Sequence, residues 1–417
     1  MNRNPDVIVV GAGVIGLCCA YYLSRAGRSV AIVEKASVGH GSSFGNCGLI
    51  TPSHARPLTQ PGMVGKALKW MAQHDAPFFV RPRFDPGLWS WFLQFARRCR
   101  EDKMREALVA RRELLNASRT LYDELIDTES LACEWTTQGV LSLCRTQAGL
   151  DQASAIEDML SGYDLAGAEY NGNDLRTVDP AIADDVVGGY LHEADASLHP
   201  NLLLDELVRV LRDRDVCFLE NTRVTAVDVN RGRVTGLASG NERLEANDIV
   251  LATGSWSPKL ARWLKLKIPI QPGKGYSVTL ARPDPCPGFA AILTERLCSV
   301  TPWSDGFRVG GTMEFSGYNT KLDRIRLDAL LRACGEYYRS RLTTEPRQEW
   351  FGWRPMTYDG IPVIDRSPKH DNVFVAAGHN MLGVSMAPGT GRLIAELVTG
   401  SEPHIDPNPY SLKRFGN

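Results

Sequence analysis

Three glycines and one carboxylate near the start of the chain have the types and spacing that bind a dinucleotide. Gly11, Gly13 and Gly16 follow one apolar run, and Glu34 closes the next. Gly11 permits a tight turn, Gly13 lets the backbone approach a pyrophosphate, and Gly16 allows a helix to pack closely on a strand. The amides and the dipole at the start of that helix favour the anion. A carboxylate at Glu34 would bind ribose hydroxyls and repel a 2′-phosphate, which argues against an NADP-type ligand. A glycine-rich turn without a ligand is the alternative.

A second cluster of small residues follows directly and distinguishes FAD from NAD. It reads Gly-His-Gly-Ser-Ser-Phe-Gly-Asn-Cys-Gly-Leu-Ile over residues 39–50. Small residues with free backbone amides suit a flat ring pressed against the main chain. A nicotinamide enzyme has no need of such a cluster at this place, so the sequence favours FAD. Composition alone would also allow an ordinary flexible loop.

The elements that must position these residues alternate between strand and helix. An apolar, β-branched run over Asp6–Val10 predicts a buried parallel strand, and a helix follows to about Ala26. Gly27 is expected to end that helix, and Ser29–Glu34 predicts the second strand. The opening is therefore a βαβ-type unit, and the fold class is α/β.

The rest of the chain predicts a second, partly helical module and a return to strands. Further helices are expected at Leu88–Arg100, Arg105–Asp127, Leu202–Arg214, Leu322–Tyr338 and Gly389–Thr399. Further strands are expected at Cys217–Glu220, Arg223–Val229, Val234–Leu237, Asp248–Ala252, Lys274–Leu280, Cys298–Thr301, Phe307–Gly311 and Asn372–Ala376, with a hairpin turn at Arg231 and Gly232. A chain of 417 residues is long enough for two or three domains.

The composition excludes several classes of function. The net charge of −1 provides no field that would attract nucleic acid. The ten cysteines contain no C-x-x-C pair, so we expect no metal site and reduced thiols in a cytoplasmic protein. The N-terminus lacks the pattern of a signal peptide, and no apolar run reaches the ~18 residues that span a bilayer. A peripheral association with the inner face of the cell membrane stays open.

Four further segments resemble the D-amino acid oxidase superfamily of flavoproteins, in particular bacterial D-amino acid dehydrogenases and their glycine oxidase relatives. They are Ile249–Ser257, Lys274–Ser277, Trp353–Ile364 and Phe374–Gly391, and with the N-terminal motif they follow the family order from Val7 to Val398. One position departs from the family pattern, because residue 365 is Asp rather than Gly. The backbone of that loop is therefore expected to differ.

The resemblance implies a Rossmann-like FAD-binding domain with a second, sheet-based substrate domain, as in glutathione-reductase-like flavoproteins. The FAD-binding domain would be assembled from residues 1–57, 188–270 and 350–417, and the substrate domain from residues 58–187 and 271–349. Some relatives bind flavin covalently through a C-terminal cysteine or a histidine in the second cluster. Because no cysteine follows Cys334 and position 47 is cysteine, we expect non-covalent FAD.

The same resemblance implies a set of residues that contact FAD. Those holding the ADP half would be Gly11, Gly13, Val14, Ile15, Gly16, Glu34 and Lys35, with Val224 near the adenine and Gly254 and Trp256 beside the nucleotide. Those along the isoalloxazine ring would be Ser42, Ser43, Asn46, Gly48 and Leu49 at its edge, and Gly352, His379, Gly383, Val384, Ser385 and Met386 beneath it.

The chemistry implied is oxidation of an amine by hydride transfer from Cα to flavin N5. No protein base is obligatory for a neutral amine, and the helix near Gly389 would direct its positive end at the flavin pyrimidine edge. Arg354 is the candidate that binds a substrate carboxylate, with a structural ion pair as its alternative. Tyr276 could donate to the same carboxylate or simply pack in a strand. His54 could contact substrate or belong to a lid, although a lone histidine is more often structural.

The leading hypothesis is a dehydrogenase of D-amino acids, including cyclic ones such as D-proline or hydroxy-D-proline, that passes electrons to a quinone or another carrier. A glycine or sarcosine oxidase that uses oxygen is the second hypothesis. A non-catalytic flavin-binding subunit and an NAD-dependent dehydrogenase are two others. Between Trp89 and Arg100, four aromatic residues are followed closely by three arginines, as in an interfacial helix, although a packed helix fits the same pattern.

Overall fold

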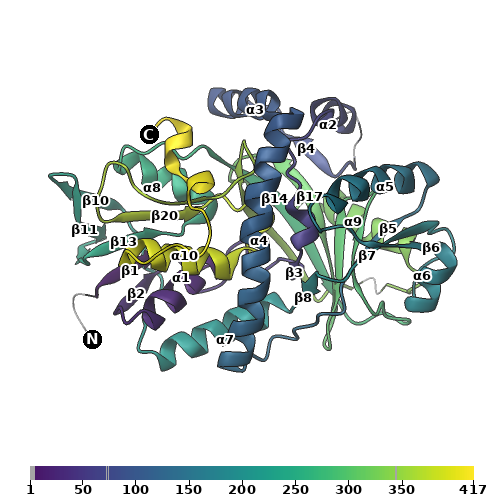
Figure 1. The fold of residues 1–417 in the computed structure, drawn as a ribbon, viewed down its shortest axis with the longest axis horizontal. Helices are drawn as coiled ribbons and strands as arrows, with labels where there is room; N and C mark the ends of the chain where they lie inside the picture. Colours follow the sequence, from purple (N-terminus) through teal and green to yellow (C-terminus); the bar gives the residue numbers. More distant parts are fainter. Residues whose placement is uncertain (1–4, 72, 74, 343–344) are drawn as a thin grey trace.

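A six-stranded sheet carries the N-terminal motif at its centre in this computed structural model, which describes residues 5–71, 73, 75–342 and 345–417 (Figure 1). Its order is β19 (Val363–Arg366), β20 (Val373–Ala377), β13 (Asp248–Leu251), β1 (Val7–Val10), β2 (Val30–Val33) and β9 (Cys217–Leu219). All neighbours are parallel except β19 and β20. Every residue of β1 is buried, as a parallel strand covered on both faces requires.

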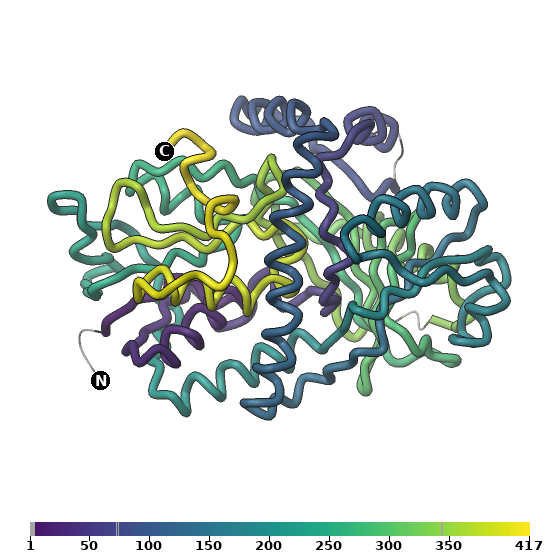
Figure 2. The backbone as a smooth tube through the Cα atoms, viewed as in Figure 1, coloured from purple at the N-terminus to yellow at the C-terminus, as the bar shows by residue number. Residues whose placement is uncertain are grey.

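Four helices cover one face of this sheet. They are α1 (Val14–Arg25), α4 (Glu101–Glu129), α7 (Pro200–Asp213) and α10 (Ala387–Thr399), and their apolar side chains share one core with Val7 and Val9. Helices α1 and α10 pack side by side although they come from opposite ends of the chain, as the purple and yellow tubes of Figure 2 show. The first and last parts of the sequence therefore build the same half of the molecule.

The opposite face of the sheet is covered mainly by strands. A three-stranded antiparallel sheet of β10 (Ala226–Asn230), β11 (Arg233–Ser239) and β12 (Glu242–Leu244) packs there with α8 (Ser257–Trp263), in a core that includes Ile8 and Val10. The predicted hairpin turn between β10 and β11 is confirmed, because Arg231 and Gly232 both have positive φ, at 47° and 78°.

A nine-stranded mixed sheet forms the other half of the molecule (Figure 1). Its path is β18 (Gln348–Thr357), β14 (Ile270–Leu280), β17 (Phe307–Phe315), β16 (Cys298–Pro302), β15 (Ala290–Leu293), β5 (Val140–Cys144), β7 (Gly188–His192) and β6 (Ala168–Asn171), and β4 (Phe78–Val80) pairs with β17. The helices of this half are α2 (Met63–Met71), α3 (Pro86–Arg98), α5 (Gln147–Ser161), α6 (Gly172–Val178) and α9 (Arg324–Tyr337). Two short strands, β3 (Leu49–Ile50) and β8 (Ala196–Ser197), pair with each other in a separate antiparallel sheet.

The predicted elements are found with shifts of a few residues, and their assignment to the two halves needs correction. The strand expected from Arg223 begins only at Ala226, and the helix expected from Gly389 already begins at Ala387. Strands β7 and β18 pair in the nine-stranded sheet, so the expected limits at residues 188 and 350 do not follow sheet membership. Helix α4, expected in the second module, packs on α10. Periodicity reveals a strand or helix, but it does not reveal which sheet the element joins.

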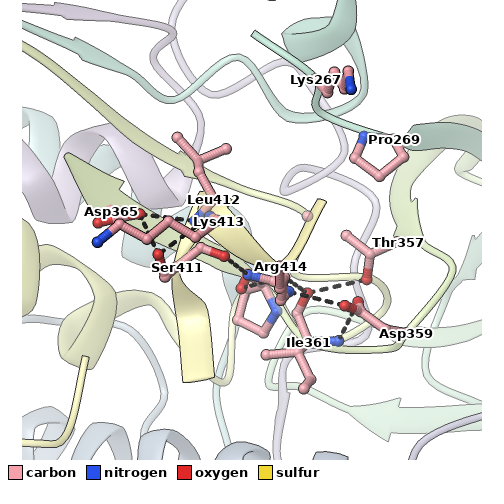
Figure 3. A network of polar contacts seen from close by, with 12 residues as sticks. Lys267, Pro269, Thr357, Asp359, Ile361, Asp365, Ser411, Leu412, Lys413 and Arg414 are labelled. Atoms are coloured by element: carbon pink, nitrogen blue, oxygen red, sulfur yellow. Dashed lines mark hydrogen bonds and ion pairs between the residues drawn. The ribbon is translucent and has the colours of Figure 1, made fainter. Parts of the chain in front are cut away.

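The carboxylates of Asp359 and Asp365 bind the C-terminal segment to the half of the molecule that contains the six-stranded sheet (Figure 3). The Asp365 carboxylate accepts hydrogen bonds from the Ser411 hydroxyl at 2.8 Å and the Leu412 amide at 2.7 Å. Arg414 Nε donates to Asp359 Oδ2 at 2.8 Å. Position 365, expected in a loop with altered backbone, therefore lies in the regular strand β19 and anchors the chain end.

Candidate active site

A cavity of about 1600 Å³ is lined by residues of both halves of the molecule. Its volume exceeds the 300–1,000 Å³ typical of a site for one drug-sized ligand, so it has room for a dinucleotide together with a substrate. Most of the residues expected around FAD and substrate line it: Gly11, Gly13, Val14, Ile15, Glu34, Lys35, Ser42, Ser43, Asn46, Leu49, His54, Val224, Gly254, Trp256, Tyr276, Arg354, His379, Gly383 and Val384.

Five expected cofactor residues do not line the cavity: Gly16, Gly48, Gly352, Ser385 and Met386. Two of the glycines instead allow close approach of backbone segments. A Cβ on Gly16 would lie 1.9 Å from the Gly11 carbonyl oxygen, and one on Gly48, whose φ is +73°, would lie 1.9 Å from the Leu198 carbonyl oxygen. The absence of a side chain at Gly16 and Gly48 therefore lets two backbone segments approach each other beside the site.

The start of α1 has the features that a pyrophosphate needs. Gly13 is the N-cap and has no side chain that could accept from the first amides of the helix. The Val14 amide donates to Ser43 Oγ at 3.1 Å, which ties the second small-residue cluster to the helix start. Glu34 stands at the end of β2, where its Oε2 accepts a hydrogen bond from the Ala12 amide at 2.9 Å. A helix N-terminus beside the cavity, with glycine as its N-cap and a serine hydroxyl at its first amide, fits the diphosphate of FAD.

Lys35 and Trp256 form the wall beside the expected nucleotide. Lys35 Nζ lies 3.1 Å from the centroid of the Trp256 ring, a cation–π contact. Burial lowers the pKa of Lys35 to about 8, so this ammonium is only weakly solvated. Gly254, with φ of +52°, turns the chain at the end of β13 and brings Trp256 to this position. A partly desolvated cation at this wall suits an anionic ligand.

The segment of residues 39–50, here called the flavin loop, is held by side chains of the nine-stranded sheet. Arg308 Nη1 donates to the carbonyl oxygens of Phe44 and Asn46 at 2.9 and 2.8 Å. Thr301 Oγ1 donates to the Cys47 carbonyl at 2.5 Å. The Trp350 ring lies so close that a Cβ on Gly45 would be 2.0 Å from it. Sequence reasoning missed all three of these residues, because their partners lie far away along the chain.

His379 lies on the wall that follows β20. Its Nε2 is 2.9 Å from Thr390 Oγ1 in α10, and burial lowers its pKa to about 3, so the ring is neutral. The cavity lining on this side ends at Val384, before α10 begins at Ala387. The Gly389 amide already donates to Ser118 Oγ at 2.9 Å. One of the amides expected to stabilise the flavin is therefore bound within the protein.

Arg354 has the properties of an anion-binding group. Its guanidinium donates to the Thr312 carbonyl and, at 3.2 Å, to the Gly311 carbonyl. No carboxylate in the described ranges lies within ion-pair distance of it, so a structural ion pair does not account for this residue. Burial lowers its pKa to about 10, which still leaves it charged at neutral pH. A Cβ on Gly275 would lie 2.3 Å from its Nη1, so the glycine of the neighbouring strand makes room for this cation.

Tyr276 lines the cavity, but its hydroxyl is bound to another side chain of the protein. The hydroxyl donates to Glu314 Oε2 at 2.7 Å in a fully buried contact. Burial, followed by this hydrogen bond, raises the pKa of Tyr276 well above its usual value. The expected donation to a substrate carboxylate is therefore absent from this geometry, because Glu314 already accepts the proton of the hydroxyl.

His54 lies on the cavity wall after the flavin loop. Its Nδ1 is 3.1 Å from Ser53 Oγ, and burial lowers its pKa to about 3. The ring is therefore a neutral imidazole at working pH.

Metal-binding clusters and membrane-spanning helices are absent from the part of the chain that the structure describes. No group of three or more His, Cys, Asp or Glu side chains there could hold a metal ion. No helix there combines the length and the apolar character needed to cross a bilayer. All ten cysteines are free thiols.

Comparison with known proteins identifies the fold and the cofactor. Residues 6–397 match the family model described as DAO, FAD dependent oxidoreductase. The chain is 33% identical to a D-amino acid dehydrogenase of Methylobacterium nodulans and 31% identical to one of Xanthobacter autotrophicus, each over 98% of this chain and 99% of the relative. Glycine oxidase from Geobacillus kaustophilus superposes with a TM-score of 0.78 at 21% identity, covering 99% of both chains. The chain therefore belongs to the FAD-dependent oxidoreductases of the DAO family, with FAD as its cofactor and a Rossmann-like FAD-binding domain joined to a second sheet domain.

Proposed function

We propose that this enzyme is a dehydrogenase that oxidises the Cα–N bond of a D-amino acid. Arg354 carries the proposal, because it is a half-buried cation without a carboxylate partner in the described ranges, on a wall of the cavity that also reaches the FAD motif. A guanidinium binds a carboxylate through two parallel hydrogen bonds, which would fix the orientation of an amino acid. FAD, when bound, accepts a hydride equivalent from Cα and leaves the Cα–N bond as an imine. The names of the curated relatives support the choice of D-amino acids.

Cyclic secondary amines such as D-proline or hydroxy-D-proline belong to the proposed substrates. The walls next to Arg354 are apolar, because Met313 and Met356 line the cavity and both would contact a Cβ placed on Gly273, the strand partner of Arg354. An apolar wall binds a compact hydrocarbon ring and offers no partner for a charged side chain. Turnover of both enantiomers of proline and of charged amino acids, measured with a dye as acceptor, tests this preference. Faster turnover of D-glutamate or D-lysine than of D-proline would contradict it.

FAD is proposed to be held without a covalent bond. Cys47 is the thiol of the flavin loop, and burial raises its pKa to about 11. Its Sγ also lies 3.6 Å from the Ser299 carbonyl oxygen, as a donor to it. A neutral, hydrogen-bonded thiol is a poor nucleophile. Acid precipitation of the protein should release all of the flavin into solution, whereas flavin retained in the pellet would show a covalent link.

The electron acceptor is proposed to be a quinone dissolved in a membrane that the enzyme touches from the cytoplasmic side. Helices α2 and α3 lie at the top of Figure 1, and both contribute residues to the cavity wall. Helix α2 has no buried residue, and Leu68, Trp89 and Leu93 are 63%, 53% and 53% exposed. Residues 61–100 hold seven basic side chains against two acidic ones: Lys66, Lys69, Arg81, Arg83, Arg97, Arg98 and Arg100 against Asp75 and Asp85. Apolar side chains within a basic surround suit the surface of an anionic bilayer.

Vesicle flotation tests this surface. Trp89→Ser combined with Leu93→Ser should reduce binding to vesicles containing anionic lipid at least 10-fold, and Val229→Ser, an exposed apolar residue on β10, should not. Reduction of a quinone in the same vesicles should fall with the binding, and by a much larger factor than dye reduction in solution. Rapid peroxide formation in air without any quinone would favour an oxidase of the glycine or sarcosine type instead.

A further inference from the structure

Three side chains form a buried hydrogen-bonded chain that leads from the cavity wall into the protein. His54 Nδ1 lies 3.1 Å from Ser53 Oγ, and Ser53 Oγ donates to Asp195 Oδ2 at 2.5 Å. The Ser53 amide donates to the other oxygen of Asp195 at 3.1 Å. The pairing of β3 with β8 brings the two segments together, since Ile50 is opposite Ala196. Neither Ser53 nor Asp195 has been assigned a part in binding FAD or the substrate.

The chemistry of the three groups fixes the direction of this chain. An ionised carboxylate only accepts hydrogen bonds, so the Ser53 hydroxyl must donate to Asp195. The single proton of that hydroxyl is then used, so the bond to His54 requires that Nδ1 carries a proton and donates it. Nε2 of the neutral ring therefore holds the lone pair. None of the described residues gives this Nε2 a hydrogen-bond partner, and the ring lines the cavity.

Asp195 is a carboxyl group without a cationic partner in the described part of the chain. It is 0% exposed, and its side chain accepts hydrogen bonds only from Ser53 among those observed. The other charged or titratable groups that act on it are Glu157 of α5, which raises its pKa, and Arg119 of α4, which lowers it. Burial is the largest cause, and the pKa of Asp195 is raised to about 7. A buried carboxyl group without a cationic partner can therefore gain and lose a proton near neutral pH.

His54 suits a relay position because its pKa is lowered, whereas that of Asp195 is raised. Burial, then the charges of His192 and Arg111, lower its pKa to about 3, so it does not stay protonated. Arg111 also holds the His54 backbone, because its Nη2 donates to the His54 carbonyl at 2.9 Å. A neutral imidazole can accept a proton at one nitrogen while it gives one from the other.

We propose that His54, Ser53 and Asp195 form a proton relay that takes a proton from the substrate ammonium group. This inference rests on the proposed function, because an amino acid amine is mostly protonated at neutral pH and lacks the lone pair that oxidation of its Cα–N bond requires. The ammonium proton goes to His54 Nε2, the Nδ1 proton of His54 goes to Ser53 Oγ, and the Ser53 hydroxyl proton goes to Asp195. One proton enters the chain and one carboxylate is neutralised, with no change in oxidation state. The reverse transfers return the proton to water after the product has left.

The test compares the pH dependence of flavin reduction in variants of the holoenzyme. Ser53→Ala interrupts the relay, Ser53→Thr keeps a hydroxyl, and Asp195→Asn removes the acceptor. Thr59→Val is the matched control, because Thr59 Oγ1 is a buried hydroxyl of the same segment without a hydrogen-bond partner. We expect Ser53→Ala and Asp195→Asn to reduce flavin at least 10-fold more slowly at pH 7 and at nearly the wild-type rate near pH 10, where the free amine is neutral. Ser53→Thr should recover most of the loss.

A second readout does not depend on turnover. In flavin-free protein, infrared spectroscopy should detect a protonated carboxyl band that titrates near pH 7 and is missing in Asp195→Asn. Equal loss of rate at every pH in Ser53→Ala, or a carboxyl band that does not titrate between pH 5 and 9, would overturn the relay. If no amino acid reduces the flavin of the wild-type enzyme, the proposed function itself fails. Reduction with an unchanged pH profile in the variants would overturn only the relay.

Discussion

Arg308 Nη1 donates a hydrogen bond of 2.9 Å to the carbonyl oxygen of Phe44, although 264 residues separate them in the sequence. Arg308 lies on β17 of the nine-stranded sheet and is 2% exposed, whereas Phe44 belongs to the flavin loop. The same guanidinium also binds the Asn46 carbonyl, and no carboxylate among the described residues pairs with it. The nine-stranded sheet therefore fixes the position of the flavin loop, although the loop follows a strand of the six-stranded sheet in the sequence.

Replacement of Arg308 by Met is expected to weaken FAD binding. The variant leaves two partly buried carbonyls of the flavin loop without their donor, at a cost of up to about 1–3 kcal/mol for each unsatisfied group. The dissociation constant of FAD, measured by titration of the flavin-free protein, should rise at least 10-fold. Arg332→Met, an exposed arginine of α9 paired with Asp75, is the control and should leave it unchanged. Unaltered FAD affinity in Arg308→Met would show that the loop holds its conformation alone.

Replacement of Arg354 by Ala should raise the apparent KM for the amino acid strongly while FAD stays bound. Two charge-assisted hydrogen bonds contribute about 1.5–3 kcal/mol each, which corresponds to an increase in KM of roughly 100-fold or more. Steady-state kinetics together with the flavin content of the purified variant check this. Arg354→Lys should recover part of the affinity, because a point charge replaces the planar fork. Loss of flavin from Arg354→Ala would instead make this residue structural.

The ion pair between Arg414 and Asp359 should hold the C-terminal segment in place. Asp359 has a side chain only 2% exposed, and Arg414→Met would leave its carboxylate buried without its cation. Loss of one partner of a buried pair costs about 3–5 kcal/mol. Thermal unfolding should show a Tm lowered by several degrees, and the double variant Arg414→Met, Asp359→Asn should recover part of the loss. A Tm equal to that of the wild type would mean that the segment adds little to stability.

Asp195 should make the stability of the protein depend on pH in a defined window. Its pKa is about 7 in the folded state and about 4 when unfolded, so between these values the folded state binds the proton that the unfolded state has lost. Stability therefore falls as pH rises from about 4 to about 7, by up to about 1.4 kcal/mol for each pH unit, and is flat above that window with respect to this group. Asp195→Asn removes the dependence. The Tm of the variant relative to the wild type should be higher at pH 8 than at pH 5, and an equal difference at both would contradict the raised pKa.

The local motifs could be predicted from the sequence because their physical causes are local. The glycines from Gly11 to Gly16 and the carboxylate of Glu34 belong to one continuous unit of strand, turn, helix and strand, so their positions in space follow from their spacing. In the structure Glu34 follows β2 directly and its carboxylate lies beside the Ala12 amide of the glycine-rich turn. The helices and strands around them were found for the same reason, since periodicity is a property of neighbouring residues.

The residues that support the site could not be predicted because their partners are distant in sequence. Ser53 and Asp195 are 142 residues apart, and Tyr276 and Glu314 are 38 apart on paired strands. No spacing rule relates such residues. The sequence left Tyr276 as either a donor to the substrate or a packed strand residue, because its neighbour on β17 could not be identified before the pairing of β14 with β17 was known.

The central claim is that this chain binds FAD in the cavity and oxidises amino acids there. The most direct measurement is the visible spectrum of the purified enzyme under anaerobic conditions, before and after addition of each enantiomer of a panel of amino acids. We predict oxidised flavin bands that bleach with D-amino acids, including D-proline, and remain with their L-enantiomers. A colourless protein, or flavin bands that no amino acid in the panel bleaches, would contradict the account.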